Sequence, residues 1–201
     1  MQILIYIACG IGAYLLGSFS FALILSDRIM KKDIRKYGSG NAGTSNMLRT
    51  FGWQIGLANF ILDVGKGMLL TFIGFWIAGS IGAMITSVCA IVGNNWPAYY
   101  GFKGGKGIAA TFGVLLVWQS IPTLIIFGVC AILIAVLRYI SVASILGLIA
   151  SVVVSFFMYS GMIYHQIAVA VIAVMAIFAH RSNIMRLIQG TENKISIKSA
   201  K

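Results

Sequence analysis

The amino-acid sequence predicts an all-α integral membrane protein, a bundle of about seven transmembrane helices. Two observations support this fold class. Of the 201 residues, 60% are hydrophobic and only 9% are charged, and the mean hydropathy is +0.97. One soluble core cannot hide so much apolar surface from water, whereas each membrane crossing uses about 20 apolar residues. We therefore expect a single membrane-embedded domain over residues 1–201, with short connections between its helices.

The apolar segments give the expected helices in chain order. The first, residues 3–25, lacks a basic leading region and a small-residue cleavage site, and Asp27 and Arg28 follow it directly. We therefore expect a retained helix rather than a signal peptide. The next six are expected at residues 53–76, 80–98, 107–119, 121–138, 141–159 and 162–180, the fourth helix of the chain being short.

The basic residues predict the orientation of the bundle. If the N-terminus lies outside, every Lys and Arg except Lys66 falls on one side, and the positive-inside rule places that side and the C-terminus in the cytoplasm. Anionic membrane lipids, and no nucleic acid, are the partners expected for the net charge of +11. The residues on this side are Arg28, Lys31, Lys32, Arg35, Lys36, Arg49, Lys103, Lys106, Arg138, Arg181, Arg186, Lys194, Lys198 and Lys201.

A first polar island, KYGSGNAGTSNMLRTFG (residues 36–52), separates the first two apolar segments. Its glycines permit positive φ and a close approach of backbone N–H groups to a ligand. Short polar side chains add donors, and the arginine presents a fork that suits two phosphate oxygens. The alternative is a flexible linker. The candidate binding residues are Gly38, Ser39, Gly40, Asn41, Ala42, Gly43, Ser45, Asn46 and Arg49.

The second island, GNNWPAYYGFKGGKGIAATFG (residues 93–113), is expected on the same side. A glycine-rich loop that runs into a helix leaves backbone N–H groups and the positive helix end available to an anion. The GxxxxGK[ST] spacing of a P-loop is absent. The candidate residues here are Lys103, Gly104, Gly105, Lys106 and Gly107.

The third island, HRSNIMRLIQGTE (residues 180–192), follows the last apolar segment. Helical spacing puts His180 and Asn183 on one face, with Arg186 one turn beyond Asn183. Both His180 and Asn183 are candidates for a site. The alternative for His180 is an interfacial or capping residue.

Two ionisable residues stand inside an apolar stretch, NFILDVGKGMLL (residues 59–70). Asp63 and Lys66 are three residues apart and share a helical face, with Asn59 one turn before Asp63. Ionisable residues in such segments usually pair and face the bundle interior. Two interpretations stay open: an ion pair that locks the second helix, and a role at a site.

Metal and cofactor chemistry are not expected. The chain has four acidic residues and two histidines, whereas Mg²⁺ or Zn²⁺ would need clusters of carboxylate, His or Cys ligands. Cys9, Cys89 and Cys130 lie in apolar segments without motif spacing, so we interpret them as small buried hydrophobic residues that form no disulfide.

The islands, in order with AYLLGSFSFA (13–22), LDVGKG (62–67) and RYISVAS (138–144), resemble the bacterial acyl-phosphate:glycerol-3-phosphate acyltransferase (PlsY) family over nearly the whole chain. The resemblance implies a seven-helix enzyme of the bacterial cell membrane with its active site facing the cytoplasm. It would transfer a fatty acyl group from acyl phosphate to the 1-hydroxyl of glycerol 3-phosphate, giving lysophosphatidic acid and phosphate.

The same resemblance implies roles for particular residues. The first island would bind the acyl-phosphate group through Ser39 and neighbouring amides. Asn94 stands in GNNWP where the family usually has a histidine, so any proton transfer by that histidine cannot apply here. We expect catalytic roles for Ser39, Arg49, Lys106, His180 and Asn183, and substrate binding by the other candidates together with Ser144.

This chemistry agrees with the residues present. Acyl phosphate already carries a good leaving group, so an alcohol can attack it directly and no Ser or Cys nucleophile is required. Alignment of two anionic substrates, and donors aimed at the developing charge, would suffice. The proton acceptor is either His180 or the substrate phosphate, whose second pKa is about 6, and we favour the phosphate, with His180 orienting the substrate.

Two functions of other classes are the alternatives. A membrane transporter for a phosphorylated metabolite would place cations along a path near the midplane, whereas here they gather on one side and no inverted repeat is visible. A lipid anchor or scaffold without catalysis would explain the basic loops but not GSGNAGTSN or FKGGKG.

Overall fold

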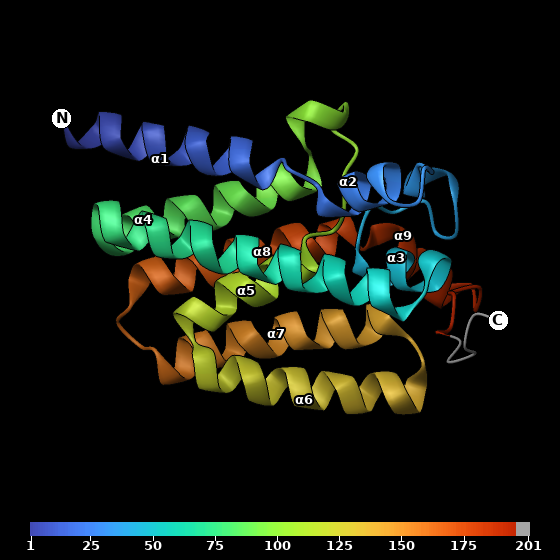
Figure 1. The fold of residues 1–201 in the computed structure, drawn as a ribbon. Helices are drawn as coiled ribbons and strands as arrows, with labels where there is room; N and C mark the ends of the chain where they lie inside the picture. Colours follow the sequence, from blue (N-terminus) through green and yellow to red (C-terminus); the bar gives the residue numbers. More distant parts are fainter. Residues whose placement is uncertain (196–201) are drawn as a thin grey trace.

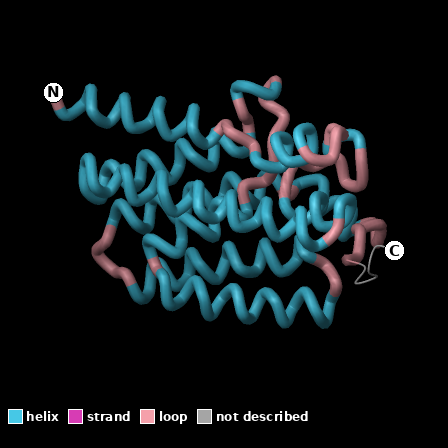
Figure 2. The backbone as a smooth tube through the Cα atoms, viewed as in Figure 1, coloured by secondary structure: helices cyan, strands magenta, loops and turns pink. Residues whose placement is uncertain are grey.

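The computed structural model describes residues 1–195, which form helices and connecting loops and contain no strand (Figures 1 and 2). The all-α prediction is confirmed for this part of the chain. Lys198 and Lys201, which entered the orientation prediction, lie outside the described residues.

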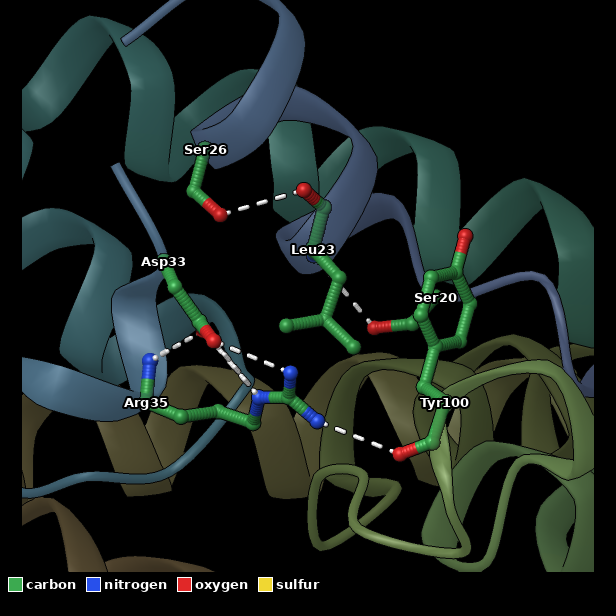
Figure 3. Close-up of polar contacts among 6 residues, drawn as sticks. All are labelled: Ser20, Leu23, Ser26, Asp33, Arg35 and Tyr100. Atoms are coloured by element: carbon green, nitrogen blue, oxygen red, sulfur yellow. Dashed lines mark hydrogen bonds and ion pairs between the residues drawn. The ribbon is translucent and has the colours of Figure 1, made fainter. Parts of the chain in front are cut away.

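The first expected helix is broken into two. Helix α1 (Gln2–Gly17) ends at Ser18, and α2 (Phe21–Arg28) begins after Ser20, whose hydroxyl accepts from the Leu23 N–H at 3.5 Å (Figure 3). Serine hydroxyls compete with the backbone for hydrogen bonds and favour helix ends. The prediction of one continuous helix over 3–25 is therefore wrong at residues 18–20, where backbone carbonyls become available to other partners.

Helix α4 (Trp53–Asn95) contains the second and third expected helices. Ala78 and Gly79 have non-helical backbone angles, and Gly79 has φ +60°, a conformation that glycine adopts at little cost. Beyond this point the chain returns against the first half of α4. A Cβ at Gly74 would lie 2.5 Å from the Gly82 carbonyl oxygen, so small residues let the two halves pack closely.

The last four expected helices, 107–119, 121–138, 141–159 and 162–180, agree with observed helices to within one residue at each end, whereas four further short helices within residues 1–195 were not among the expected ones. The short helix α3 lies in the first island, which begins at the last residue of η1, whereas η2 lies in the second island and α9 in the third. The remaining elements are η1 (Ile34–Lys36), α3 (Thr44–Phe51), η2 (Ala98–Tyr100), α5 (Ile108–Trp118), α6 (Ser120–Leu137), α7 (Ile140–Met158), α8 (Ile163–Ala179) and α9 (Arg181–Ile188).

Four helical stretches within residues 1–195 are long and apolar enough to cross a membrane. The pair α8 and α9, bent by 54°, would be a fifth. The stretch Trp53–Tyr100 includes both halves of α4. The four stretches are Gln2–Arg28, Trp53–Tyr100, Ser120–Leu137 and Ile140–Met158.

The distribution of apolar and polar side chains is the reverse of that in a water-soluble protein. Large apolar side chains face outward, for example Trp76 with 82% of its surface exposed and Phe157 with 82%. Polar side chains such as Asn59, Thr71 and Ser87 are completely buried. Water would penalise this distribution, whereas lipid stabilises it. The fold is that of an integral membrane protein.

The first two islands lie in contact. Just before the first island, the Arg35 guanidinium pairs with Asp33 at 2.9 Å and donates to the carbonyl oxygen of Tyr100, in the second island, at 3.1 Å (Figure 3). A Cβ at Gly105 would lie 2.5 Å from the Ala42 carbonyl oxygen. Glycine at this position therefore allows the second island to pack directly on the backbone of the first.

Candidate active site

One cavity of about 620 Å³ opens between the islands and the helices. All three islands contribute polar residues to its wall, and α4, α5, α6 and α7 contribute apolar ones. The islands lie at helix ends and the apolar residues lie within helices, so the cavity runs from the helix ends into the bundle. Rings from three helices pack along it, with centroid distances of 5.9 Å for Phe60–Phe112, 4.5 Å for Phe112–Phe127 and 6.0 Å for Phe60–Phe127.

Asn46 shapes the first island. Its Nδ2 donates to the carbonyl oxygens of Ile34 at 3.3 Å, Tyr37 at 2.9 Å and Asn41 at 3.0 Å, and its Oδ1 accepts from the Ser39 N–H at 2.9 Å. The side chain is 1% exposed. The loop therefore uses both the Asn46 amide and the Ser39 backbone N–H. The Ser39 hydroxyl has no hydrogen bond within residues 1–195, and Ser39 lines the cavity.

The glycines of the first island differ in their positions. Gly43 lines the cavity and precedes α3. Gly38 and Gly40 lie outside the cavity wall and have φ +57° and +72°, so they serve the turns of the loop. Asn41, Ala42, Ser45 and Arg49 line the cavity as well.

The second island is held against the end of α4. The N–H groups of Gly104 and Gly105 donate to the carbonyl oxygens of Asn95 and Asn94, each at 3.2 Å. Neither glycine lines the cavity, and the exposed Lys103 also lies outside it. Gly107 and Lys106 do line the cavity. The loop thus uses two N–H groups that the sequence suggested for an anion.

Glu192 organises the cavity wall that the third island provides. Its carboxylate accepts from Asn183 Nδ2 at 2.6 Å, from Arg186 Nε at 2.8 Å and from Ser141 Oγ at 2.9 Å. Lys106 Nζ donates to Asn183 Oδ1. We call these five residues the Glu192 cluster. They come from α7, α9, the loop after α9 and the loop before α5, so one carboxylate fixes the positions of several donors.

Sequence reasoning did not select Ser141, Arg186 or Glu192 for the site. Arg186 and Glu192 belong to the third island, and Ser141 belongs to RYISVAS. A usable signal for Glu192 was that it is the only acidic residue of the third island, where two arginines and a histidine lie nearby. Ser144, which was selected, lines the cavity from α7.

Burial changes the acid–base properties of this cluster. It lowers the pKa of Lys106 to about 8, an effect that Glu192 opposes and Arg186 and Arg49 reinforce. Burial alone would raise the pKa of Glu192, but hydrogen bonds from Asn183, Arg186 and Ser141 lower it overall. Near neutrality Glu192 is therefore ionised, and Lys106 carries its charge and loses it above about pH 8.

His180 and Arg49 line the same cavity, and each has hydrogen-bonding groups that the described fold does not use. His180 is buried, and its Nδ1 lies 2.7 Å from the Ala176 carbonyl oxygen. A carbonyl only accepts, so the neutral ring carries its hydrogen on Nδ1 and keeps a lone pair on Nε2. The Arg49 side chain on α3 has no hydrogen bond to any residue that the structure describes.

Lys66 is the centre of a second polar cluster, inside the bundle. Its Nζ lies 3.3 Å from Asp63 Oδ1, which confirms the predicted pairing. It also donates to the carbonyl oxygens of Gly17 at 3.1 Å and Phe19 at 2.9 Å, at the break between α1 and α2, and to Asn94 Oδ1 at 2.8 Å. We call these five residues the Lys66 cluster.

The Lys66 cluster extends to the first island. Asn59 Nδ2 donates to Asp63 Oδ2 at 3.1 Å and to Thr44 Oγ1 at 2.9 Å. Thr44, Asp63 and Asn94 line the cavity, whereas Lys66 lies behind them. The ion pair therefore agrees with both interpretations. It locks α4 to α1, and it also supports a wall of the cavity.

The cysteines within residues 1–195 are free thiols. Cys9, Cys89 and Cys130 are half-buried rather than fully buried, and Cys130 lines the cavity. The described residues contain no cluster of three His, Cys, Asp or Glu side chains that could hold a metal ion.

Comparisons with known proteins place this geometry in context. Residues 7–190 match the family model for glycerol-3-phosphate acyltransferase. The glycerol-3-phosphate acyltransferase of Finegoldia magna is 39% identical over 195 residues, covering 97% of this chain and 98% of the relative. That of Thermoanaerobacter pseudethanolicus is 41% identical over 188 residues, covering 93% and 94%.

The fold is similar to crystal structures of PlsY, an integral membrane glycerol 3-phosphate acyltransferase, at 31% identity. The TM-score is 0.88 for the glycerol 3-phosphate form, over 95% of this chain and 96% of the other. It is 0.85 for the lysophosphatidic acid form, over 95% of each chain.

Proposed function

The chain belongs to the glycerol-3-phosphate acyltransferase family, and on that premise we propose that it transfers a fatty acyl group from acyl phosphate to the 1-hydroxyl of glycerol 3-phosphate. The products are lysophosphatidic acid and phosphate. One observation carries the proposal: a single cavity joins cationic and amide groups at the helix ends to an apolar wall inside the bundle. Such a cavity fits two phosphorylated groups and one acyl chain.

The first island supplies the acyl-phosphate site. The N–H groups at the start of α3 face a cavity that Gly43, Thr44 and Ser45 line, and a helix N-terminus favours an anion. The Ser39 hydroxyl adds a donor, while Gly38, Gly40 and Asn46 keep the loop in shape. The acyl chain lies along the apolar wall that includes Phe60 and Phe112.

The second and third islands supply the glycerol 3-phosphate site. Lys106 and Arg49 bind phosphate, Lys106 as a point charge and Arg49 through its planar fork. Asn183 and Ser144 contact the glycerol portion. Gly104 and Gly105 act by holding Lys106 and Gly107 in place, and Lys103 contributes charge outside the cavity.

The reaction is a direct acyl transfer. The 1-hydroxyl oxygen of glycerol 3-phosphate attacks the acyl carbonyl carbon, a new C–O ester bond forms, and the C–O bond to the phosphate group breaks. Phosphate leaves with the bonding electrons. The hydroxyl proton passes to the glycerol 3-phosphate dianion, which His180 orients through Nε2. The donors around Lys106 and Arg49 stabilise the charge that develops on the reacting groups.

Topology completes the proposal. We infer seven crossings, an N-terminus outside, a C-terminus in the cytoplasm and residues 1–201 as one domain of the bacterial cell membrane. The basic residues that surround the cavity are those of the cytoplasmic loops, so the active site faces the cytoplasm. Surrounding lipids cover the exposed apolar side chains, and the acyl chain enters from the membrane.

The test uses the purified full-length protein with acyl phosphate and glycerol 3-phosphate. Phosphate and lysophosphatidic acid should appear in equal amounts and only when both substrates are present. Phosphate release without glycerol 3-phosphate, or no release, would overturn acyl transfer. Uptake of glycerol 3-phosphate into proteoliposomes without ester formation would instead support the transporter alternative.

A further inference from the structure

Asn94 stands where the first two islands meet, and the proposed mechanism has not used it. It lies near the end of α4, is 7% exposed and lines the cavity. Its backbone carbonyl holds Gly105, which packs on Ala42 of the first island. The side chain is therefore positioned beside both loops that surround the phosphate groups.

The contact with Lys66 fixes the orientation of the Asn94 amide. Lys66 Nζ lies 2.8 Å from the amide oxygen. An ammonium group donates and never accepts, so the amide atom that faces it is the oxygen. The Nδ2 group, with its two N–H donors, must then face away from Lys66.

The other contacts of Lys66 keep its ammonium group in place, and this maintains the orientation of the Asn94 amide. Its three N–H donors are used by the carbonyl oxygens of Gly17 and Phe19 and by Asn94, and Asp63 balances its charge. Rotating the amide by half a turn would set N–H donors against an ammonium group. The surrounding fold thus holds the Asn94 amide in one orientation before any substrate binds.

The Nδ2 donors have no acceptor among residues 1–195. A Cβ at Gly105 would lie 3.5 Å from Nδ2, which locates the group beside the Gly105 backbone. Both Ala42, on which Gly105 packs, and Lys106, the next residue, line the cavity. An amide donor that is held in one orientation, has no partner within residues 1–195 and belongs to a residue of the cavity wall is suited to a ligand acceptor.

We propose that Asn94 is a catalytic residue whose Nδ2 donates to an oxygen of bound acyl phosphate, and that Lys66 is the positioning residue that aims it. The inference rests on the proposed function. The donor stabilises the negative charge that develops as the hydroxyl oxygen attacks and the phosphate group departs. Neither Asp63 nor Lys66 transfers a proton in the reaction, and Lys66 acts on it only by orienting Asn94.

The decisive variant is Asn94→Asp. A carboxylate still accepts from Lys66, and more strongly, so a purely structural role survives the change. It has no N–H to donate and adds negative charge beside an anionic substrate. We expect kcat/KM for acyl phosphate to fall by about 10²-fold or more, in a detergent-solubilised protein that still unfolds cooperatively on heating.

The matched variant is Asn94→His. A neutral imidazole can accept from Lys66 with one nitrogen and donate with the other. We expect it to keep kcat/KM within about tenfold of the wild type, since one donated hydrogen bond distinguishes the two variants. Activity in Asn94→His and its loss in Asn94→Asp together support the proposal.

Several outcomes would overturn it. If Asn94→Asp keeps kcat/KM within about threefold of the wild type, Asn94 serves only to bind Lys66. If Asn94→Asp fails to fold, Asn94→His decides, because a folded but inactive protein would exclude rescue by a donor. An inactive wild type would overturn the proposed function itself, so the two failures are distinguishable.

Discussion

Lys66 and Lys106 are both part of the polar network around the cavity, but the protein uses them differently. Lys66 donates to two backbone carbonyls and one amide oxygen and pairs with Asp63. Within residues 1–195 the Lys106 ammonium makes one hydrogen bond, to Asn183, and Lys106 lines the cavity. An ammonium group has three N–H donors. The fold thus saturates one lysine and leaves the other with donors for a substrate.

The difference teaches how to separate structural from substrate-binding cations. A buried charge is costly unless partners replace its water. Lys66, whose side chain is 6% exposed, finds all its partners within the fold. Lys106 keeps its positive charge beside open space, and Glu192 balances it from a distance through Asn183. We expect the first to control stability, and to affect the reaction only through Asn94, whereas the second contacts the substrate directly.

The largest expected effect is on stability, in Lys66→Met. This change leaves Asp63 buried without its counter-ion and should lower the free energy of unfolding by about 3–5 kcal/mol. The double variant Asp63→Asn, Lys66→Met should recover part of the loss, because no unpaired charge stays buried. Unfolding of the detergent-solubilised proteins would measure the free energy of unfolding of each variant. Equal losses in the single and double variants would mean that the ion pair does not contribute to stability.

The next effect is on activity, in Lys106→Ala. Loss of the ammonium donor should lower kcat/KM by about 10²- to 10³-fold in a folded, membrane-inserted protein. Lys103→Ala is the matched control, because Lys103 belongs to the same loop but is exposed outside the cavity. Equal losses in both variants would mean that loop charge, rather than contact with phosphate, supports the reaction.

Arg49→Lys tests whether geometry matters besides charge. Lysine keeps the positive charge but loses the planar fork that can bind two phosphate oxygens. We expect kcat/KM to fall by about tenfold, because roughly one charge-assisted hydrogen bond to phosphate is lost. Full activity in steady-state assays would reduce Arg49 to a charge that orients the helix ends.

The pKa of Lys106, about 8, predicts a pH dependence. Lys106 is charged below that pH and neutral above it, so kcat/KM should fall as the pH rises through about 8, by about tenfold per unit well above it. In Lys106→Arg the residual activity should not show this fall, because a guanidinium keeps its proton. A fall near pH 8 that persists in Lys106→Arg would assign it to another group.

The smallest effect is expected for His180→Gln. Glutamine can still orient the substrate by hydrogen bonds, so kcat/KM should fall by less than about tenfold. In His180→Ala, which cannot form them, the fall should be larger than about tenfold. The rate should still rise with pH near the second ionisation of glycerol 3-phosphate, at about 6. A loss of about 10²-fold in both variants, with this rise abolished, would make His180 the general base.

Some of the site could be predicted from residue type and local spacing. All five residues expected to be catalytic line the cavity, as does Ser144. Asp63 and Lys66 pair as their helical spacing indicates, because residues three apart share one helical face. These features depend on groups that are close in sequence or whose chemistry allows few roles.

The sequence by itself determined the membrane class and the approximate ranges of most of the long apolar helices, because hydropathy acts locally along the chain. Only the tertiary structure decided which donors the fold itself uses. Asn46, Gly104 and Gly105 are used inside the loops, whereas Glu192 reaches Ser141 across 51 positions and Lys66 reaches Gly17 across 49. Such pairings depend on how helices pack, and helix packing depends on contacts between distant residues that no local pattern specifies.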